Sequence, residues 1–341
     1  MGERLTASSV TYVPKEGVML SDIQIESFLP LELRERFNLS DQKLIPYLAK
    51  EPEVLASIKR SIDKLASNHK IVNGDSRRMA DIPDNSVHLA VTSPPYWTLK
   101  KYPDRDGQLG GIENYEKFLT LLNEVWREVY RVLVPGGRLV VVVGDVCLSR
   151  RAYGRHVVFP LHASIQEHCR GIGFDNLAPI IWYKISNANF EVKNGSSFLG
   201  KPYEPNAVIK NDIEYILFQR KPGGYRSPDF KARLLSVIPG TDHKEWFNQI
   251  WNIGGASTKH HPAPFPLAVA ERLIRMFSFV GDTVLDPFMG TGTTNLAAYL
   301  WGRNSIGYDI EPAYVDMSLQ RIKSKSIKVD LFSSTSEEAL G

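Results

Sequence analysis

The spacing of hydrophobic residues alternates between two periods from about residue 70 onward. Short continuous apolar runs are typical of strands buried on both faces, and apolar residues spaced by three or four positions are typical of amphipathic helices. The predicted strands are Val87–Thr92, Arg138–Val143, Leu177–Tyr183, Ile213–Gln219, Thr283–Leu285 and Ser305–Tyr308. The predicted helices are Tyr115–Leu133, His162–His168, Pro266–Phe279, Thr294–Trp301 and Tyr314–Ile322. This alternation predicts an α/β fold with a doubly wound, mostly parallel sheet and helices on both faces.

The two ends of the chain follow another pattern. Glu53–Ala66 places apolar residues at helical spacing. Shorter helices are predicted over Ile23–Phe28, Leu31–Phe37 and Lys43–Leu48. We therefore expect a helical N-terminal extension over residues 1–66, an α/β domain over 67–325 and a polar tail over 326–341.

Two polar segments interrupt the alternation of strands and helices. They are Ser186–Asn211, which is rich in Asn, Gly, Lys and Pro, and Lys221–Gly255. Long irregular segments inside a compact α/β domain are commonly functional loops. We therefore expect an inserted functional region over about residues 186–255.

The composition excludes several classes of protein. With 43% hydrophobic and 23% charged residues in a chain of 341, it is typical of a globular protein whose core needs no covalent staples. The chain lacks an apolar run of roughly 18 residues, the length that spans a membrane, and its start lacks a signal-peptide pattern. Its two cysteines, Cys147 and Cys169, match neither a disulfide framework nor a zinc site. We expect a cytoplasmic protein that binds no membrane and no metal.

A strand, a glycine-rich turn and a helix together mark a candidate nucleotide site. The predicted strand Thr283–Leu285 leads into Asp286-Pro287-Phe288-Met289-Gly290-Thr291-Gly292-Thr293-Thr294. Doubly wound sheets bind ligands beyond the carboxyl ends of their strands, and glycines let the backbone approach a ligand closely. Because no lysine follows the second glycine, the turn is not a Walker P-loop. We expect the Asp286 carboxylate to project into this crevice and Asp309, at the end of the next strand, to hold a ribose diol.

A second motif, Thr92-Ser93-Pro94-Pro95-Tyr96-Trp97, follows the buried strand Val87–Thr92. Its two prolines rigidify the backbone and donate no hydrogen bond, so carbonyl oxygens remain as fixed acceptors. The exocyclic amine of a nucleobase is a poor nucleophile because its lone pair is delocalised into the ring. Acceptors at the Ser93 hydroxyl and the Pro94 carbonyl would bind both N–H groups and free this lone pair to attack a methyl sulfonium. Tyr96 would offer a face on which an extruded base stacks.

Together the two motifs resemble the amino-group DNA methyltransferases, and the resemblance spans roughly residues 70–325. Ser93, Pro94, Pro95 and Tyr96 look like the catalytic tetrapeptide of that family, and Asp286–Gly292 looks like its cofactor loop. The catalytic motif precedes the cofactor motif, an order that resembles the circularly permuted β group. The stretch His261–Pro266 resembles a helix-entry motif near the cofactor methionine.

The resemblance implies a seven-stranded methyltransferase sheet, S-adenosylmethionine as methyl donor and a flipped-out base in double-stranded DNA as target. The residues that it assigns to the cofactor are Asp75, Pro264, Phe265, Asp286, Pro287, Phe288, Gly290, Gly292, Thr293 and Asp309. In the family, Ser at the first motif position goes mostly with cytosine N4, whereas Asp or Asn goes with adenine N6. We therefore expect cytosine N4 as target, with adenine N6 as the alternative.

Basic residues in predicted loops are candidates for DNA contacts, although the net charge, 41 − 38 = +3, is small. We expect target recognition in Lys221–Glu245, because arginine commonly reads guanine, and a closing loop over Thr98–Leu109. The candidate DNA contacts are Lys100, Lys101, Arg151, Tyr225, Arg226, Lys231 and Arg233.

Four other functions stay open on the sequence alone. They are adenine N6 methylation, methylation of RNA or a free small molecule, DNA binding without catalysis, and an unrelated nucleotide-binding α/β protein. The complete Ser93–Tyr96 and Asp286–Gly292 motifs argue against DNA binding without catalysis, and the unrelated protein would bind NAD or ATP instead. The sequence also leaves open a homodimer and a cognate restriction endonuclease as partner.

Overall fold

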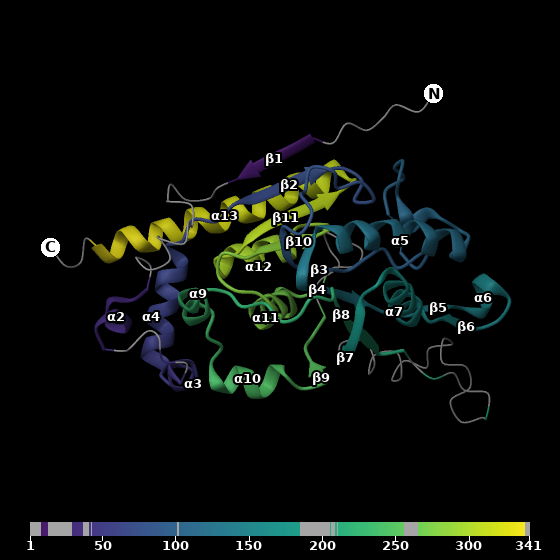
Figure 1. The fold of residues 1–341 in the computed structure, drawn as a ribbon. Coiled ribbons are helices and arrows are strands. Elements are labelled where there is room, and N and C mark those ends of the chain that lie inside the picture. Colours follow the sequence, from purple (N-terminus) through teal and green to yellow (C-terminus); the bar gives the residue numbers. More distant parts are fainter. Residues whose placement is uncertain are drawn as a thin grey trace.

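A nine-stranded sheet forms the centre of the protein (Figure 1). The computed structural model describes residues 8–12, 29–36, 41, 43–100, 102–184, 205, 209, 211–255 and 265–337. The strand order is β1-β2-β11-β10-β3-β4-β8-β7-β9. These strands are β1 (Ser8–Tyr12), β2 (His69–Asn73), β3 (Val87–Thr92), β4 (Leu133–Val143), β7 (Asp175–Tyr183), β8 (Ile213–Arg220), β9 (Ile250–Asn252), β10 (Thr283–Asp286) and β11 (Asn304–Asp309).

The seven inner strands, from β2 to β7 in the sheet order, form the expected methyltransferase sheet. Strands β2, β11, β10, β3 and β4 run parallel, whereas β8 is antiparallel to both of its neighbours. Two edge strands extend the expected number. Strand β1 comes from the N-terminal extension, so the prediction that this extension is wholly helical was wrong, and β9 comes from the expected insert.

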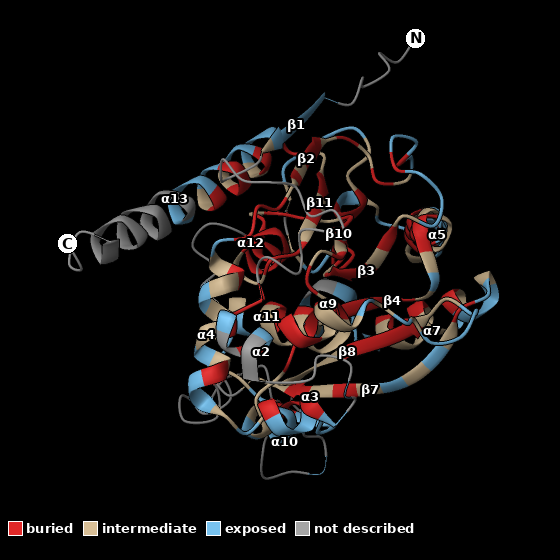
Figure 2. Cartoon of the chain, turned by 60° about the vertical axis from the view of Figure 1, so that its left-hand side comes forward, coloured by how far each residue is buried: buried red, intermediate tan, exposed pale blue. Residues whose placement is uncertain are grey.

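Helices cover both faces of the sheet because each presents one apolar stripe to it. On one face lie α5 (Tyr115–Val132) and α7 (Leu161–Ile172), whose buried side chains share a core with β3 and β4. On the other face lie α11 (Leu267–Phe277) and α12 (Thr293–Leu300). The helix α13 (Pro312–Glu337) packs against α12 and β2. Figure 2 shows the buried strands between these layers and the exposed strand β1 at the edge.

The helices of the N-terminal extension form a separate small core away from the sheet. These helices are α2 (Leu31–Arg36), α3 (Leu44–Leu48) and α4 (Pro52–Asp63). They bury Leu33, Leu48 and Ile58 against α9 (Phe230–Leu235), which comes from the expected insert. Helix α9, α10 (Gly240–Trp246) and β9 show that residues 221–255 are not the irregular segment that their composition predicts.

Several predicted boundaries lie close to the observed ones, and others fail. The predicted strand Val87–Thr92 matches β3, and the helix expected over Tyr115–Leu133 matches α5 to within one residue. Residues 326–337 of the expected polar tail continue the helix α13. The helix expected over Ile23–Phe28 lies outside the described residues. Among the described helices, none is long and apolar enough to cross a membrane.

Two segments far apart in the sequence meet at the carboxyl ends of β2 and β11. Asp309 pairs with Asn73 in the parallel ladder, and the backbone N–H of Gly74 donates to the carbonyl of Asp309 at 3.0 Å. The loop after each strand therefore opens at the same edge of the sheet. The loops after β10 and β3 open there too, because all four strands are parallel.

Candidate active site

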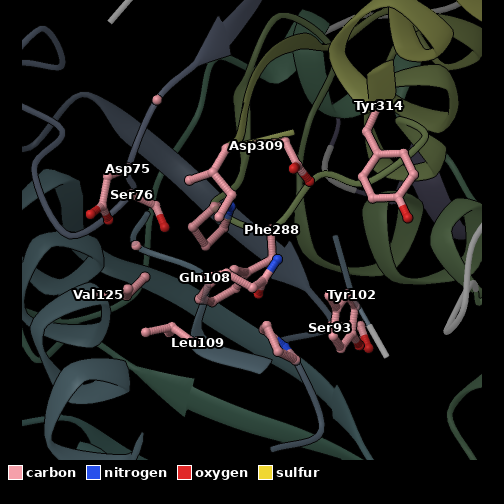
Figure 3. Close-up of a pocket in the computed structure, with 15 residues that line it drawn as sticks. Asp75, Ser76, Ser93, Tyr102, Gln108, Leu109, Val125, Phe288, Asp309 and Tyr314 are labelled. Atoms are coloured by element: carbon pink, nitrogen blue, oxygen red, sulfur yellow. The ribbon is translucent and has the colours of Figure 1, made fainter. Parts of the chain in front are cut away.

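A pocket lies at the carboxyl ends of β2, β11, β10 and β3, where a doubly wound sheet binds its ligands (Figure 3). Polar side chains and apolar rings line it together. The lining residues are Gly74, Asp75, Ser76, Ser93, Pro95, Tyr102, Gly107, Gln108, Leu109, Val125, Pro287, Phe288, Asp309, Ile310 and Tyr314. Of the residues predicted to bind a cofactor, Asp75, Pro287, Phe288 and Asp309 therefore lie here.

Asp309 is held in place by backbone N–H groups from two loops, the one after β10 and the one after β11. One carboxylate oxygen accepts from the N–H of Gly290 and the other from the N–H of Glu311, each at 2.9 Å. Burial raises the pKa of Asp309 to about 6 despite these two hydrogen bonds. Since an ionised carboxylate can accept roughly four hydrogen bonds, acceptor capacity remains for a ligand.

Asp75 lines the pocket in an ion pair with Arg77. The Arg77 Nε donates to both carboxylate oxygens of Asp75, at 3.0 and 2.9 Å. The Arg77 backbone N–H donates to the same carboxylate at 2.9 Å. Because several hydrogen bonds fix it, Asp75 presents its carboxylate in one orientation.

Asp286 does not project into the pocket, so this expectation was wrong. Its side chain is only 1% exposed, and its oxygens accept from Thr92 at 2.6 Å, Thr294 at 2.7 Å and the N–H of Phe288 at 3.0 Å. Burial raises its pKa to about 6. The carboxylate instead ties the end of β3 to the start of α12 beneath the pocket floor.

The glycines of the cofactor loop also support the pocket from behind rather than lining it. Gly290 and Gly292 both have positive φ, of 51° and 75°. A Cβ built on Gly292 would lie 2.0 Å from the hydroxyl oxygen of Ser318 in α13. Arg321 of α13 donates to the hydroxyl of Thr293 at 3.2 Å, so α13 clamps the loop from outside. Gly290, Gly292 and Thr293 therefore shape the loop that carries Phe288.

A chain of polar groups leads from the pocket into the protein. The Ser93 hydroxyl, at the pocket wall, lies 3.1 Å from the Tyr96 hydroxyl, and Tyr96 donates to Glu214 at 3.4 Å. Glu214, at the start of β8, also forms an ion pair with Lys184. Burial first, and then the Glu214 charge, raise the pKa of Tyr96 well above its usual range. The sequence analysis missed Glu214 because 118 residues separate it from Tyr96.

Tyr96 is less accessible than its predicted role in base stacking suggests. Its side chain is only 6% exposed, and its ring belongs to the core on the α5 face. Pro94 is likewise buried, whereas Ser93 and Pro95 reach the pocket.

The loop expected to close on DNA lies against the pocket itself. Tyr102, Gln108 and Leu109 line the pocket. Arg105 holds the loop across the sheet edge, because its Nε donates to Glu311 at 3.0 Å. No signal in the sequence marks this pair, since 206 residues separate its members.

The predicted DNA contacts in the insert lie at the edge of the sheet opposite the pocket. Tyr225 and Arg226 follow the end of β8, beside the amino end of β4, where Arg220 pairs with Arg138. Arg226 forms a two-point ion pair with the buried Asp282, at 2.6 Å for each bond. It is therefore a structural residue, and its assignment as a DNA contact was wrong.

Lys231 and Arg233 lie in α9, which packs on the N-terminal helices and, through Ser236, on the residue Val280 before β10. This too is the edge opposite the pocket, so the structure does not bring these residues to the site.

The remaining predicted residues divide between the site and other places. Lys100 is half-buried just beyond the catalytic motif, and Arg151 is exposed beyond the carboxyl end of β4. Phe265 packs in the core between α11 and the sheet and does not line the pocket. Lys101 and Pro264 lie outside the described residues.

The geometry suits a nucleoside. Asp309 offers acceptor capacity at the end of β11, the position that holds ribose hydroxyls in such sheets. Phe288 offers an apolar ring beside it, and the Ser93 hydroxyl stands at the other end of the same pocket. A bound nucleoside and a polar reacting group can therefore meet in one place.

Comparisons with known proteins agree with this geometry. The model of the N6_N4_Mtase family, described as DNA methylase, matches residues 87–320. The type II methyltransferase M.MjaI of Methanocaldococcus jannaschii is 39% identical over 303 residues, which cover 79% of this chain and 96% of that protein. The type II methyltransferase M.MthZI of Methanothermobacter thermautotrophicus is 33% identical and matches 76% of this chain and 77% of its own.

Solved structures show the same fold. A DNA modification methylase of Thermus thermophilus, in complex with S-adenosyl-L-methionine, is 53% identical with a TM-score of 0.63. The match covers 76% of this chain and 93% of that one. The cytosine-N4-specific PvuII DNA methyltransferase, 21% identical, has a TM-score of 0.53 over 75% of this chain and 89% of its own. With S-adenosylmethionine as its cofactor, this chain belongs to the family of N6/N4 amino-group DNA methyltransferases.

Proposed function

We propose that this DNA methyltransferase modifies the exocyclic N4 amine of cytosine in double-stranded DNA, by direct attack from a flipped-out base. The observation that carries the proposal is Ser93, whose neutral hydroxyl lies at the wall of the pocket, where a carboxylate or amide would favour adenine N6. Adenine N6 is the second candidate, since the family contains both activities. A hydroxyl and a proline carbonyl suffice to accept two N–H bonds from either amine.

The residues at the strand ends divide the binding of the cofactor between them. Asp309 would accept from the ribose hydroxyls, Phe288 would pack on the adenine and Asp75 would face the adenine edge. When bound, S-adenosylmethionine supplies a methyl group on a positively charged sulfur. The order of the motifs, with the catalytic strand β3 before the cofactor strand β10, supports membership of the β group.

Glu214 supplies an acceptor for the proton that the reaction releases. A methylated exocyclic amine stays cationic until one N–H bond breaks. In the proposed relay, that proton passes to the Ser93 oxygen, the Ser93 proton to the Tyr96 oxygen and the Tyr96 proton to the Glu214 carboxylate. Both hydroxyls are regenerated, and the net transfer is one proton from the base to Glu214.

The surroundings of the enzyme are part of the proposal. Because its relatives include type II methyltransferases, a cognate restriction endonuclease would share its recognition sequence. We propose a cytoplasmic enzyme, where both DNA and S-adenosylmethionine are at hand, and we leave the homodimer as a further proposal.

The experiment is an identification of the methylated nucleoside. The protein is incubated with labelled S-adenosylmethionine and mixed-sequence duplex DNA, which is then digested to nucleosides. Label in N4-methylcytosine supports the proposal, and label in N6-methyladenine replaces it by the second candidate. The variant Ser93→Ala is the control, because a loss of label with retained cofactor binding ties the product to this site.

A further inference from the structure

A small hairpin projects from the catalytic edge of the sheet. It consists of β5 (Val146–Leu148), α6 (Arg150–Tyr153) and β6 (Val157–Phe159), and its strands pair antiparallel. The hairpin begins three residues after the carboxyl end of β4, the edge that also holds the pocket. Figure 1 shows α6 at its outer end, away from the sheet.

The base of the hairpin is fixed to the catalytic motif. Val146 is fully buried, and the Phe159 ring lies 4.8 Å from the ring of Trp97, the residue after Tyr96. Trp97 also packs on Tyr115 of α5 at 5.0 Å between ring centroids. Because the buried Trp97 packs on the rings of Phe159 and Tyr115, the base of the hairpin keeps a defined position relative to the Ser93 loop.

The outer end carries positive charge without compensation. Residues 146–166 contain three arginines and no aspartate or glutamate. Arg150, Arg151 and Arg155 are all exposed, and within the described part of the chain none of them forms an ion pair. Elsewhere ion pairs are common for arginine. The paired ones are Arg77, Arg105, Arg131, Arg170, Arg220, Arg226, Arg272 and Arg275.

An aromatic side chain accompanies these charges. Tyr153 is 44% exposed at the end of α6, and the Arg155 guanidinium lies 5.5 Å from the centre of its ring. Arginines beside an exposed aromatic ring are the groups that bind phosphates and sugars of nucleic acids. The exposed Val158 adds an apolar surface beside them.

We propose that this hairpin binds the phosphodiester backbone of the substrate duplex next to the flipped base. The inference rests on the proposed function and gives it a docking surface. It also replaces the segment 221–233 as the main source of phosphate contacts, because that segment lies at the opposite edge of the sheet. The arginines position the duplex and carry no sequence information by themselves.

The test compares two variants with the same change in charge. The hairpin variant is Arg150→Gln/Arg151→Gln/Arg155→Gln, and the control is Lys50→Gln/Lys64→Gln/Lys244→Gln, whose lysines are exposed and lie outside the hairpin. The dissociation constant of a fluorescent mixed-sequence duplex is measured at several salt concentrations. Each lost phosphate contact lowers the slope of log K against log salt by about 0.9.

We expect the hairpin variant to lose at least about 10-fold in duplex affinity and to lower the slope by about 2–3. The control variant should keep a duplex affinity and a salt slope close to those of the unaltered protein. Equal behaviour of the two variants would overturn the inference. Unchanged cofactor affinity, measured by titration, would show that the hairpin variant is folded. The single variant Arg151→Gln should lose duplex affinity in the same direction, by a smaller factor. If the unaltered protein binds duplex DNA but methylates none, the proposed function fails while the docking surface remains.

Discussion

The close approach of α13 to the cofactor loop makes Gly292 the most informative position to perturb. Gly292 has φ +75°, a conformation that costs other residues about 1–2 kcal/mol. A Cβ there would also lie 2.0 Å from the Ser318 hydroxyl and 3.1 Å from the Ser318 Cα. Ser318 is fully buried, so it has no solvent to move into, and such overpacking costs about 1–3 kcal/mol.

For Gly292→Ala we therefore expect a loss of about 2–5 kcal/mol in the free energy of unfolding, measured by urea titration. The loop should also shift, because relief of the contact moves α13 away from it. S-adenosylmethionine affinity, measured by calorimetry, should fall by about 10-fold or more, equivalent to about 1.4 kcal/mol.

The matched control is Gly224→Ala, which has φ +89° but open space around the added Cβ. It should lose only the conformational part, about 1–2 kcal/mol. A Gly292→Ala variant no less stable than this control would refute the reasoning from the Ser318 contact. The double variant Gly292→Ala/Ser318→Gly should recover part of the loss, because it removes the group that the Cβ meets.

Three further outcomes test the buried charges. Since the folded pKa of Asp286, about 6, lies above its unfolded value of about 3.9, unfolding titrations should show stability falling by about 3 kcal/mol as the pH rises from about 4 to 6. Asp309, whose folded pKa is also about 6, adds a second loss over the same range, so Asp286→Asn should remove only part of the total. Glu214→Gln and Tyr96→Phe should each lower kcat by at least about 10-fold with unchanged cofactor affinity, and equal loss of cofactor affinity would contradict the proton relay. Arg226→Ala should destabilise by about 3–5 kcal/mol in urea, because it removes the two-point ion pair of the buried Asp282, yet duplex affinity should stay unchanged.

Local patterns were enough to predict most of the sheet and both motif loops. The run Val87–Thr92 is buried on both faces and could only be a central strand, as β3 is. The strand β2 was not predicted, because His69 and Lys70 interrupt its apolar pattern. His69 is nevertheless fully buried, between the hydroxyls of Ser67 at 2.9 Å and Ser305 at 2.7 Å, a contact that no local pattern reports.

The roles of site residues were harder to predict than their places in the sequence. Asp286 stands out in the sequence as a ligand-binding carboxylate, but it holds the loop in place from inside the protein. Its hydrogen bonds with Thr92 and Thr294 show this role, and they are visible only in the structure. Basic residues were harder still. Arg226 and Arg151 look alike in sequence, but one meets a buried carboxylate and the other meets solvent. The difference arises because Arg226 meets Asp282, a residue just before β10 that is distant in the sequence, whereas Arg151 has no such partner among the described residues.

The pairing of β2 with β11 has a consequence for synthesis of the chain. The Asn73 side chain donates to the carbonyl of Asp309, which is made 236 residues later. A ribosome would thus complete Ser93 and its loop long before the strand that carries Asp309 emerges. The cofactor pocket closes only when the final strand inserts between β2 and β10. A nascent chain that ends before β11 therefore lacks Asp309, Ile310 and Tyr314 of the pocket, and its binding site for the methyl donor is incomplete.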